Sequence, residues 1–189
     1  MFNLKSIKIY FFSILKLILL KLKNLYFKSS LYNQRLVSSC PSRIFYNPST
    51  HLIFPLISSS NDVYKVENIS PESIWKHNYK KSIEFDNLQS FLWLTKLDRK
   101  SSKVFVQAII KSWIDRYYNY NVAAWKMDVM SKRIIAWASN TDLTLQDSDV
   151  KYKKDFFLSI IKQSNHLLKN IKNLTYDSNR IIVCAALIL

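Results

Sequence analysis

The chain has 189 residues, of which 49% are hydrophobic and 22% are charged, a balance that suits one folded domain with an appendage and excludes wholesale disorder. It contains no glycine, which excludes every glycine-rich nucleotide-binding loop. The net charge is +15, and the first 61 residues contain eight basic residues and no acidic one, so nucleic acid, acidic lipid and acidic polysaccharide are all candidate partners.

Residues 1–37 are predicted to form a basic amphipathic helix. The stretch 7–27 (IKIYFFSILKLILLKLKNLYF) is the most hydrophobic of the chain, but lysines interrupt it and Lys16 lies near its middle. A charge at that depth of a spanning helix costs about 2.5–3.5 kcal/mol, and no Ala-x-Ala-like cleavage site follows Leu20. We expect the helix to dock on protein or lie on a membrane surface, with a membrane anchor and a signal sequence as alternatives.

Residues 38–86 are predicted to form a loop-rich strap. All four prolines of the chain lie here, together with the serine run 58–60. Short β-branched and aromatic clusters at 43–46 and 51–57 favour one or two short strands. Because no proline occurs elsewhere, the rest of the chain is free to form long helices.

Residues 87–189 are predicted to form helical hairpins. Between 101 and 120, apolar residues recur every three or four positions, and Ser101 or Ser102 can cap the start of the helix. A second helix is expected over 125–138. The buried stripes of these two helices are predicted to be Val106, Ile109, Ile110, Trp113, Ile114 and Tyr117 in the first, and Met127, Met130, Ile134, Trp137 and Ala138 in the second.

Two further helices are expected before the last residue. The first runs from about 149 to 173 and is predicted to turn inward Phe157, Ile160, Ile161, Leu168 and Ile171. The second begins near Asp177 as its N-cap and is apolar almost all round up to Leu189. A helix that is apolar on every side must be buried between others. We therefore expect the fold to continue beyond this helix, with a buried terminal helix as the alternative.

The sequence contains no recognisable catalytic or metal-binding motif. His51, His77 and His166 are scattered, with no HExxH or comparable ligand spacing around them. Cys40 and Cys184 lie far apart and are expected to be free thiols. No GxSxG segment is present. We therefore predict no metal, no cofactor and no catalytic residue in this chain.

Aromatic residues are dense along the predicted helices. The five tryptophans are interleaved with Arg99, Arg116 and Arg133. One interpretation is core packing, because indole rings bury large apolar areas. The other is a saccharide-binding wall, because pyranose rings stack on indoles while arginines pair with acidic sugar groups.

Five segments follow one another in a characteristic order and spacing. They are NLQSFLWLTKL at 87–97, SWIDRYYN at 112–119, AWKMDVMSKRIIAW at 124–137, IIKQSNHLLKNI at 160–171 and RIIVCAALIL at 180–189. Together they resemble the N-terminal helical region of the bacterial heparinase II/III-like family. The resemblance covers roughly residues 60–189. Two positions depart from the family pattern: Gln89 stands where the family usually has histidine, and Lys162 where it often has arginine.

The resemblance implies a mainly α fold, an incomplete α/α toroid of helical hairpins that is followed in the family by an antiparallel β-sandwich. Related lyases cleave uronic-acid polysaccharides by β-elimination. It further implies that the catalytic groups lie outside this chain, in later toroid helices and the β-sandwich. The chain alone is then expected to be inactive, with an acidic polysaccharide and the missing β-sandwich region or a complementary chain as its partners.

Four of the matching positions are the candidate saccharide-binding residues: Trp93, Trp125, Arg133 and His166. His166 is expected on a different side of its helix from Ile160, Ile161 and Leu168, where it can line a cleft. Arg133 has a second interpretation, in which it orients helix packing or pairs with Asp128.

The alternative function is that of a basic helical protein that binds a membrane surface or nucleic acid. Residues 5–35 contain seven basic residues and no acidic one. For a bacterial chain of this kind, a cytoplasmic or membrane-peripheral location is favoured over secretion, because no signal peptide is recognised.

Overall fold

The computed structural model describes residues 4–37, 71, 74–75, 82–97 and 103–189. Every regular element in these ranges is helical, so the mainly α class is confirmed, while the toroid arrangement stays a prediction. The elements are α1 (Leu4–Lys28), α2 (Ser30–Val37), α4 (Ser82–Ser90), the 3₁₀ helix η2 (Leu92–Lys96), α5 (Lys103–Tyr117), α6 (Met127–Ser139), α7 (Thr141–Thr144), α8 (Val150–Asn170), the 3₁₀ helix η3 (Ile171–Asn173) and α9 (Asp177–Ile188).

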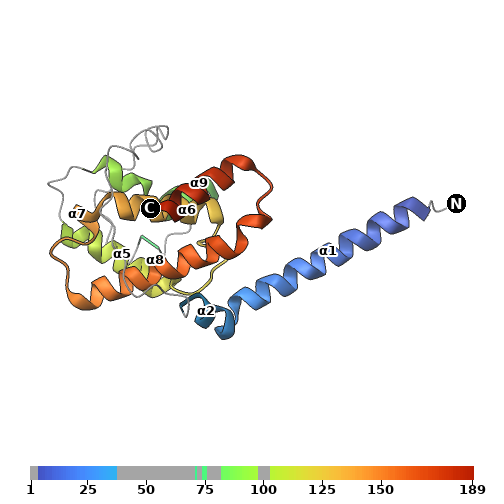
Figure 1. Ribbon diagram of the computed structural model, residues 1–189, viewed down its shortest axis with the longest axis horizontal. Coiled ribbons are helices and arrows are strands. Elements are labelled where there is room, and N and C mark those ends of the chain that lie inside the picture. Colours follow the sequence, from blue (N-terminus) through green and yellow to red (C-terminus); the bar gives the residue numbers. More distant parts are fainter. Residues whose placement is uncertain (1–3, 38–70, 72–73, 76–81, 98–102) are drawn as a thin grey trace.

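α1 extends away from the remaining helices, which we call the helical body (Figure 1). Its C-terminal end joins the body, because the buried ring of Phe27 lies 4.7 Å from that of Tyr32 and 5.0 Å from that of Tyr120. Asn24 also accepts a hydrogen bond of 3.4 Å from the Tyr120 hydroxyl. No helix in the part of the chain that the structure describes combines enough length with enough apolar character to span a membrane.

The helical body is built around α6, which packs against α4, η2, α7, α8 and α9. α5 packs on α7 and α8, and α2 packs on α8. The centre of the core is aromatic: Trp137 lies edge-on to Trp113 at 5.3 Å between ring centroids and stacks on Phe156 at 5.2 Å. Large rings at the crossing of three helices therefore provide much of the buried apolar area.

The predicted stripes of α5 and α6 are largely confirmed. All six predicted residues of α5 are buried. In α6, Met130, Ile134 and Trp137 are buried, whereas Met127 and Ala138 are half-buried. Residues 101 and 102, the expected caps of α5, lie outside the described residues.

The predicted inward face of α8 was wrong in part. Leu168 is 62% exposed, and Phe157, Ile160 and Ile171 are only half-buried. The buried residues of α8 also recur every three or four positions, but several of them are polar. Their amide, hydroxyl and imidazole groups can be buried because they form hydrogen bonds inside the body. The prediction is confirmed for Ile161, and the buried residues of α8 are Tyr152, Phe156, Ser159, Ile161, Lys162, Gln163, His166, Leu167 and Asn170.

The alternative in which α9 is a fully buried terminal helix is not found. Val183 and Ala186 are buried against the body, but Ile181 is 67% exposed and Ile188 is 83% exposed. The helix begins at Asp177, so the N-cap position is Tyr176 and not Asp177. α9 therefore packs through one face and presents apolar side chains on another.

The predicted boundary between the strap and the hairpins needs a correction. α4 already begins at Ser82, inside the predicted strap of 38–86, and Ile74 and Trp75 from the strap are buried in the body. The strands expected at 43–46 and 51–57 lie outside the described residues.

The link between α4 and η2 turns through Phe91, whose φ of 56° lies in the left-handed region. This conformation costs a residue such as Phe about 1–2 kcal/mol, and the chain contains no glycine, the residue that adopts it freely. The ring of Phe91 is fully buried and contacts those of Trp93, Trp113 and Trp137. Aromatic packing thus offsets the backbone cost of the turn.

Candidate functional site

The structure places all four predicted saccharide-binding residues in the interior. Trp93 in η2, Trp125 before α6, Arg133 in α6 and His166 in α8 are each buried. It brings only Trp125 and His166 of the four into ring contact. The ring of Trp125 meets that of His166 edge-on at 5.4 Å, whereas Trp93 stacks on Phe91 at 5.4 Å. None of the four side chains lies on an open surface, so in this structure they pack and do not form a saccharide-binding wall.

Arg133 connects three parts of the body. Its Nε donates to Gln163 Oε1 of α8 at 2.7 Å, its Nη1 to the Gln89 carbonyl of α4 at 2.9 Å, and its Nη2 to the Ala124 carbonyl at 3.1 Å. The guanidinium lies 4.1 Å from the ring centroid of Trp113. Burial lowers the pKa of Arg133 below its usual value. Three hydrogen bonds and an aromatic face therefore replace the water that this cation loses.

The role of Arg133 in helix packing is thus confirmed, but its pairing with Asp128 is not found. Asp128 lies 4.0 Å from Lys132, one turn along α6. The indole of Trp113 donates to Gln89 Oε1 at 2.5 Å, so the residue at the family's histidine position belongs to the same network. We call Gln89, Trp113, Arg133 and Gln163 the polar layer.

His166 lies in a second buried cluster beside the polar layer. Its Nδ1 is 2.8 Å from the hydroxyl of Tyr32, which also accepts a hydrogen bond of 3.2 Å from Asn170 Nδ2. Burial, with the charges of Lys23 and Lys169, lowers the pKa of His166 to about 4. Burial also raises the pKa of Tyr32 to about 12. At neutral pH both groups are therefore uncharged, and neither serves as a strong base.

An open polar groove lies near this cluster, where α2 meets α8 and the segment after α5. Its volume is about 650 Å³. None of the described residues that line it is acidic, and two are lysines. We call it the basic groove; it is lined by Lys28, Ser30, Asn33, Gln34, Val37, Tyr118, Asn119 and Lys162.

Lys162 lies in the wall of the basic groove, and its side chain is buried, with only 2% of the residue exposed. Its Nζ donates to Asn119 Oδ1 at 2.7 Å and lies 3.9 Å from the ring centroid of Tyr118. Burial lowers the pKa of Lys162 to about 8, so the amine is still mainly protonated at neutral pH. No carboxylate is among the partners recorded for it in the described residues. An anionic ligand in the groove would supply the missing opposite charge.

Sequence reasoning noted Lys162 only as a departure from the family pattern and did not predict the basic groove. The residues that line it come from three segments, at 28–37, 118–119 and 162. Lys162 lies between Ile161 and Gln163, which are both buried. A lysine between two buried positions is unusual, and it is the one sequence signal that could have indicated a buried cation in this helix.

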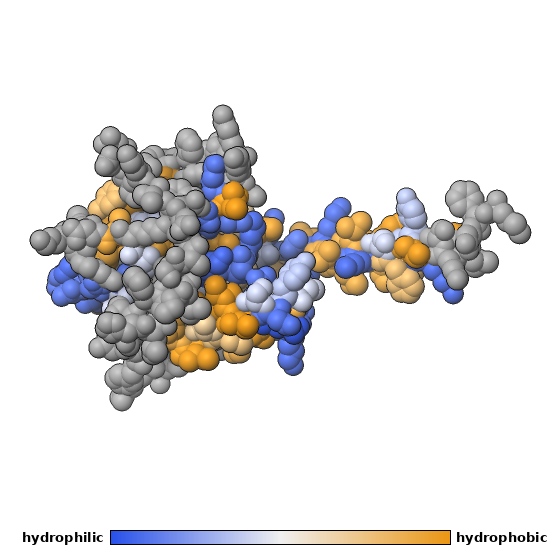
Figure 2. Space-filling view, turned by 90° about the horizontal axis from the view of Figure 1, so that it is seen from above, coloured by the Kyte–Doolittle hydropathy of each residue, from blue (hydrophilic) through white to orange (hydrophobic). Residues whose placement is uncertain are grey.

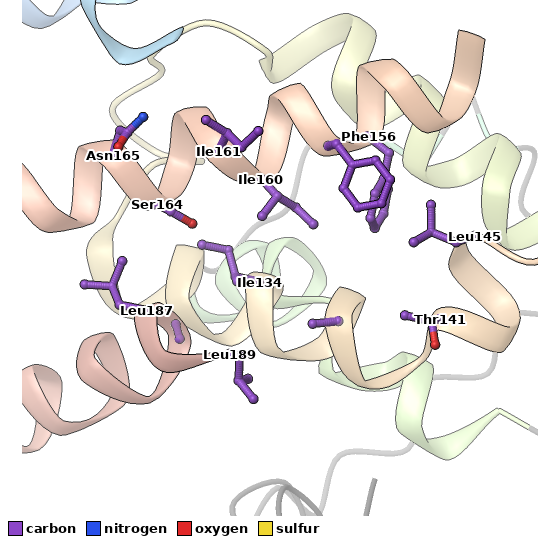
Figure 3. A pocket seen from close by; sticks show the side chains of 13 residues that line it. Ile134, Thr141, Leu145, Phe156, Ile160, Ile161, Ser164, Asn165, Leu187 and Leu189 are labelled. Carbon is purple, nitrogen blue, oxygen red and sulfur yellow. The ribbon is translucent and has the colours of Figure 1, made fainter. Parts of the chain in front are cut away.

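A second groove, of about 350 Å³, lies between α8 on one side and α6, α7 and α9 on the other. Figure 3 shows Ile160 and Ile161 of α8 above the groove and Ile134 of α6 with Leu187 below it. We call it the apolar groove. It is lined by Ile134, Ala138, Thr141, Leu145, Phe156, Phe157, Ile160, Ile161, Ser164, Asn165, Ala186, Leu187 and Leu189.

The two grooves present groups that can bind a ligand. The basic groove offers the exposed ammonium of Lys28 and side-chain amides, with the buried Lys162 in its wall, and such groups suit carboxylates and hydroxyls. Within the described residues, no three histidine, cysteine, aspartate or glutamate side chains are placed to hold a metal ion. Cys184 is a free, exposed thiol, as expected.

Comparisons of the chain with protein-family models, with curated proteins and with solved structures gave no match.

Proposed function

We propose that this chain is the N-terminal helical part of a polysaccharide lyase that resembles the heparinase II/III-like family and acts on uronic-acid polysaccharides by β-elimination. In this proposal the chain binds the acidic saccharide and supplies part of the helical scaffold. It does not carry the groups that break the glycosidic bond, so it is inactive alone.

The observation that carries the proposal is the basic groove. β-Elimination at a uronic acid needs a cation to neutralise the carboxylate, a base to remove the C5 proton and an acid to protonate the leaving oxygen. Lys28 is exposed in the groove and can meet the first requirement, and the buried ammonium of Lys162 adds positive potential behind it. His166 and Tyr32 do not meet the second, because they are paired with each other in the interior. Substrate binding without turnover is therefore the function that this geometry supports best.

The two faces of α8 support the scaffold part of the proposal. One face is buried through the polar layer, and the opposite face presents Phe157, Ile160 and Ile161 to the apolar groove. An apolar face of this kind is stable in water only when another element covers it. In an incomplete toroid, a further helical hairpin would pack there.

The proposal is tested by measuring saccharide binding by calorimetry. We expect the chain to bind uronic-acid oligosaccharides prepared from heparin or alginate, and not neutral dextran oligosaccharides. The double variant Lys28→Met, Lys162→Met should weaken binding at least about 10-fold, because each lysine contributes a charge-assisted contact. The matched control is Lys151→Met, Lys154→Met, which removes two exposed charges outside the groove. Equal binding of dextran, or equal losses in both variants, would refute the proposal.

The pKa of Lys162 gives a second, independent readout. Since the amine loses its charge above pH 8, affinity for the acidic oligosaccharide should fall as the pH rises through about 8. Lys162→Arg, which stays charged, should keep its affinity across that range. An affinity that does not change with pH in the unsubstituted chain would remove Lys162 from the site.

The absence of turnover is the third expectation. Incubation of the chain with heparin or alginate should give no rise in the ultraviolet absorbance of the unsaturated product. Clear turnover by the chain alone would contradict the statement that its catalytic groups lie elsewhere.

A further inference from the structure

α1 has a stripe without lysine along its length. At 100° per residue, the stripe occupies a sector of about 100°. Each member is between 41% and 64% exposed, and Figure 2 shows apolar side chains along the projecting helix. We call this the α1 stripe. It consists of Ile7, Phe11, Ile14, Leu15, Ile18, Leu22 and Leu25.

The charges of α1 are arranged around this stripe. The helix contains six lysines and no acidic residue. On the same helical projection, Lys8 and Lys21 border the stripe, whereas Lys16 and Lys23 lie on the opposite side. A lysine at the border can keep its aliphatic stem on an apolar surface while its ammonium reaches a negative group beside it. The stripe and the charges therefore fit a partner that is apolar inside and anionic at its surface.

Two other partners satisfy only part of this arrangement. A second copy of α1 could cover the stripe, but it would place lysines against lysines with no acidic residue to pair with them. A nucleic acid could pair with the lysines, but it would leave the stripe in water. A bilayer with anionic headgroups satisfies both, because acyl chains cover the apolar side chains and headgroups pair with the lysines.

We infer that α1 lies along the surface of an anionic lipid bilayer, with the α1 stripe in the acyl region and the bordering Lys8 and Lys21 among the headgroups. The helix of 25 residues is about 37 Å long, enough to lie across several lipids. Its end is fixed to the body by Phe27 and Asn24, so binding holds the helical body at the membrane surface. This role goes beyond saccharide binding and does not depend on it.

The inference is tested by co-sedimentation of the full chain with lipid vesicles. We expect binding to vesicles of equal parts phosphatidylcholine and phosphatidylglycerol. Binding to pure phosphatidylcholine should be at least about 10-fold weaker, and added salt should reduce binding to the anionic vesicles. No binding to the anionic vesicles would overturn the inference, and so would equal binding to both kinds.

Variants separate the stripe from the charges. Phe11→Ser, Ile18→Ser should weaken vesicle binding by at least about 10-fold, because each side chain leaves the acyl region. Both residues are exposed, so the body should keep its unfolding transition. The matched control, Val104→Ser, Val150→Ser, changes two exposed apolar residues of the body and should bind like the unsubstituted chain. Equal binding by both double variants would refute a role for the stripe.

The competing partners are measured in the same buffer. If a DNA or RNA duplex binds more tightly than the anionic vesicles, and Phe11→Ser, Ile18→Ser does not weaken that binding, the partner is nucleic acid and the inference fails. If sedimentation without lipid shows a dimer that this variant dissociates, the stripe is an interface between copies and the inference also fails. Saccharide binding by the variant should be unchanged, which separates this test from that of the proposed function.

Discussion

The two faces of α8 differ in a way that reverses the usual relation between polarity and burial. The face toward α2 and α6 contains Ser159, Gln163 and His166, and it is buried. The face toward the apolar groove contains Phe157 and Ile160, and it is only half-buried. Polar groups can lie inside because hydrogen-bond partners satisfy them, whereas the apolar groups line a groove that no other element in the described part of the chain covers. Burial therefore depends on the available partners as much as on hydrophobicity.

The largest effect is expected in the polar layer. Arg133→Met leaves the carbonyls of Gln89 and Ala124 and the amide oxygen of Gln163 without their donor. We expect the free energy of unfolding to fall by about 3 kcal/mol, since each unsatisfied buried acceptor is costly. Denaturant unfolding, followed by tryptophan fluorescence, measures this loss.

The matched control for that variant is Arg116→Met. Arg116 is exposed on α5, and its removal should change the free energy of unfolding by less than about 0.5 kcal/mol. Equal losses in the two variants would mean that Arg133 does not hold the helices together.

A pH-dependent effect is expected from the buried face of α8. The pKa of His166 is about 4 in the folded chain and near 6.5 when unfolded, so protonation favours unfolding. The stabilising contribution of the neutral ring is complete above about pH 6.5 and is lost as the pH falls towards 4. We expect unfolding free energy to fall by up to about 3 kcal/mol across this window, as measured by denaturant unfolding at a series of pH values.

Two variants identify the histidine responsible. His166→Gln should remove this part of the pH dependence, because glutamine does not titrate. His51→Gln, His77→Gln, which changes the other two histidines, should retain it. A slope that persists in His166→Gln would assign the effect to another group.

The smallest effect is expected on the apolar face of α8. Ile160→Ser should change the free energy of unfolding by less than about 1 kcal/mol, because the side chain is only half-buried beside an open groove. Ile109→Ser, at a fully buried position of α5, should cost at least about 3 kcal/mol. Denaturant unfolding of both variants tests this difference, and a similar loss in the two would show that the apolar face of α8 is already covered.

The sequence predicted the helices better than their burial. The stripe of α5 was correct at every position, because Val106, Ile109 and their neighbours are apolar and their partners lie within this chain. α8 was predicted with nearly correct bounds, and Asp149, which accepts from the Tyr152 amide at 2.8 Å, fixes its start. Its predicted inward face was wrong in part, because periodicity assigns polar residues to the outside. The spacing of apolar residues does not predict hydrogen bonds between residues far apart in the sequence, such as that between His166 and Tyr32.

The candidate site shows the same limit. Trp125 and His166 do lie together, and Arg133 does bridge helices, but aromatic and arginine content does not reveal that these side chains are buried. The basic groove depends on Lys28 and Lys162, which the fold brings to one groove from 134 positions apart in the sequence. No local sequence motif predicts that these two lysines lie in one groove. Their proximity follows from the packing of α2 on α8, which only the structure shows.

The central claim is that the apolar face of α8 is open in this chain, and thiol alkylation under native conditions tests it most directly. Ile160→Cys and Leu167→Cys are each made in a chain from which Cys40 and Cys184 have been removed, so that each variant has one thiol. The reference is a chain that lacks Cys40 and keeps the exposed Cys184. We predict that Ile160→Cys reacts at a rate close to that of Cys184, and that Leu167→Cys, on the buried side, reacts at least about 100-fold more slowly. Equal protection of Ile160→Cys and Leu167→Cys would contradict the claim.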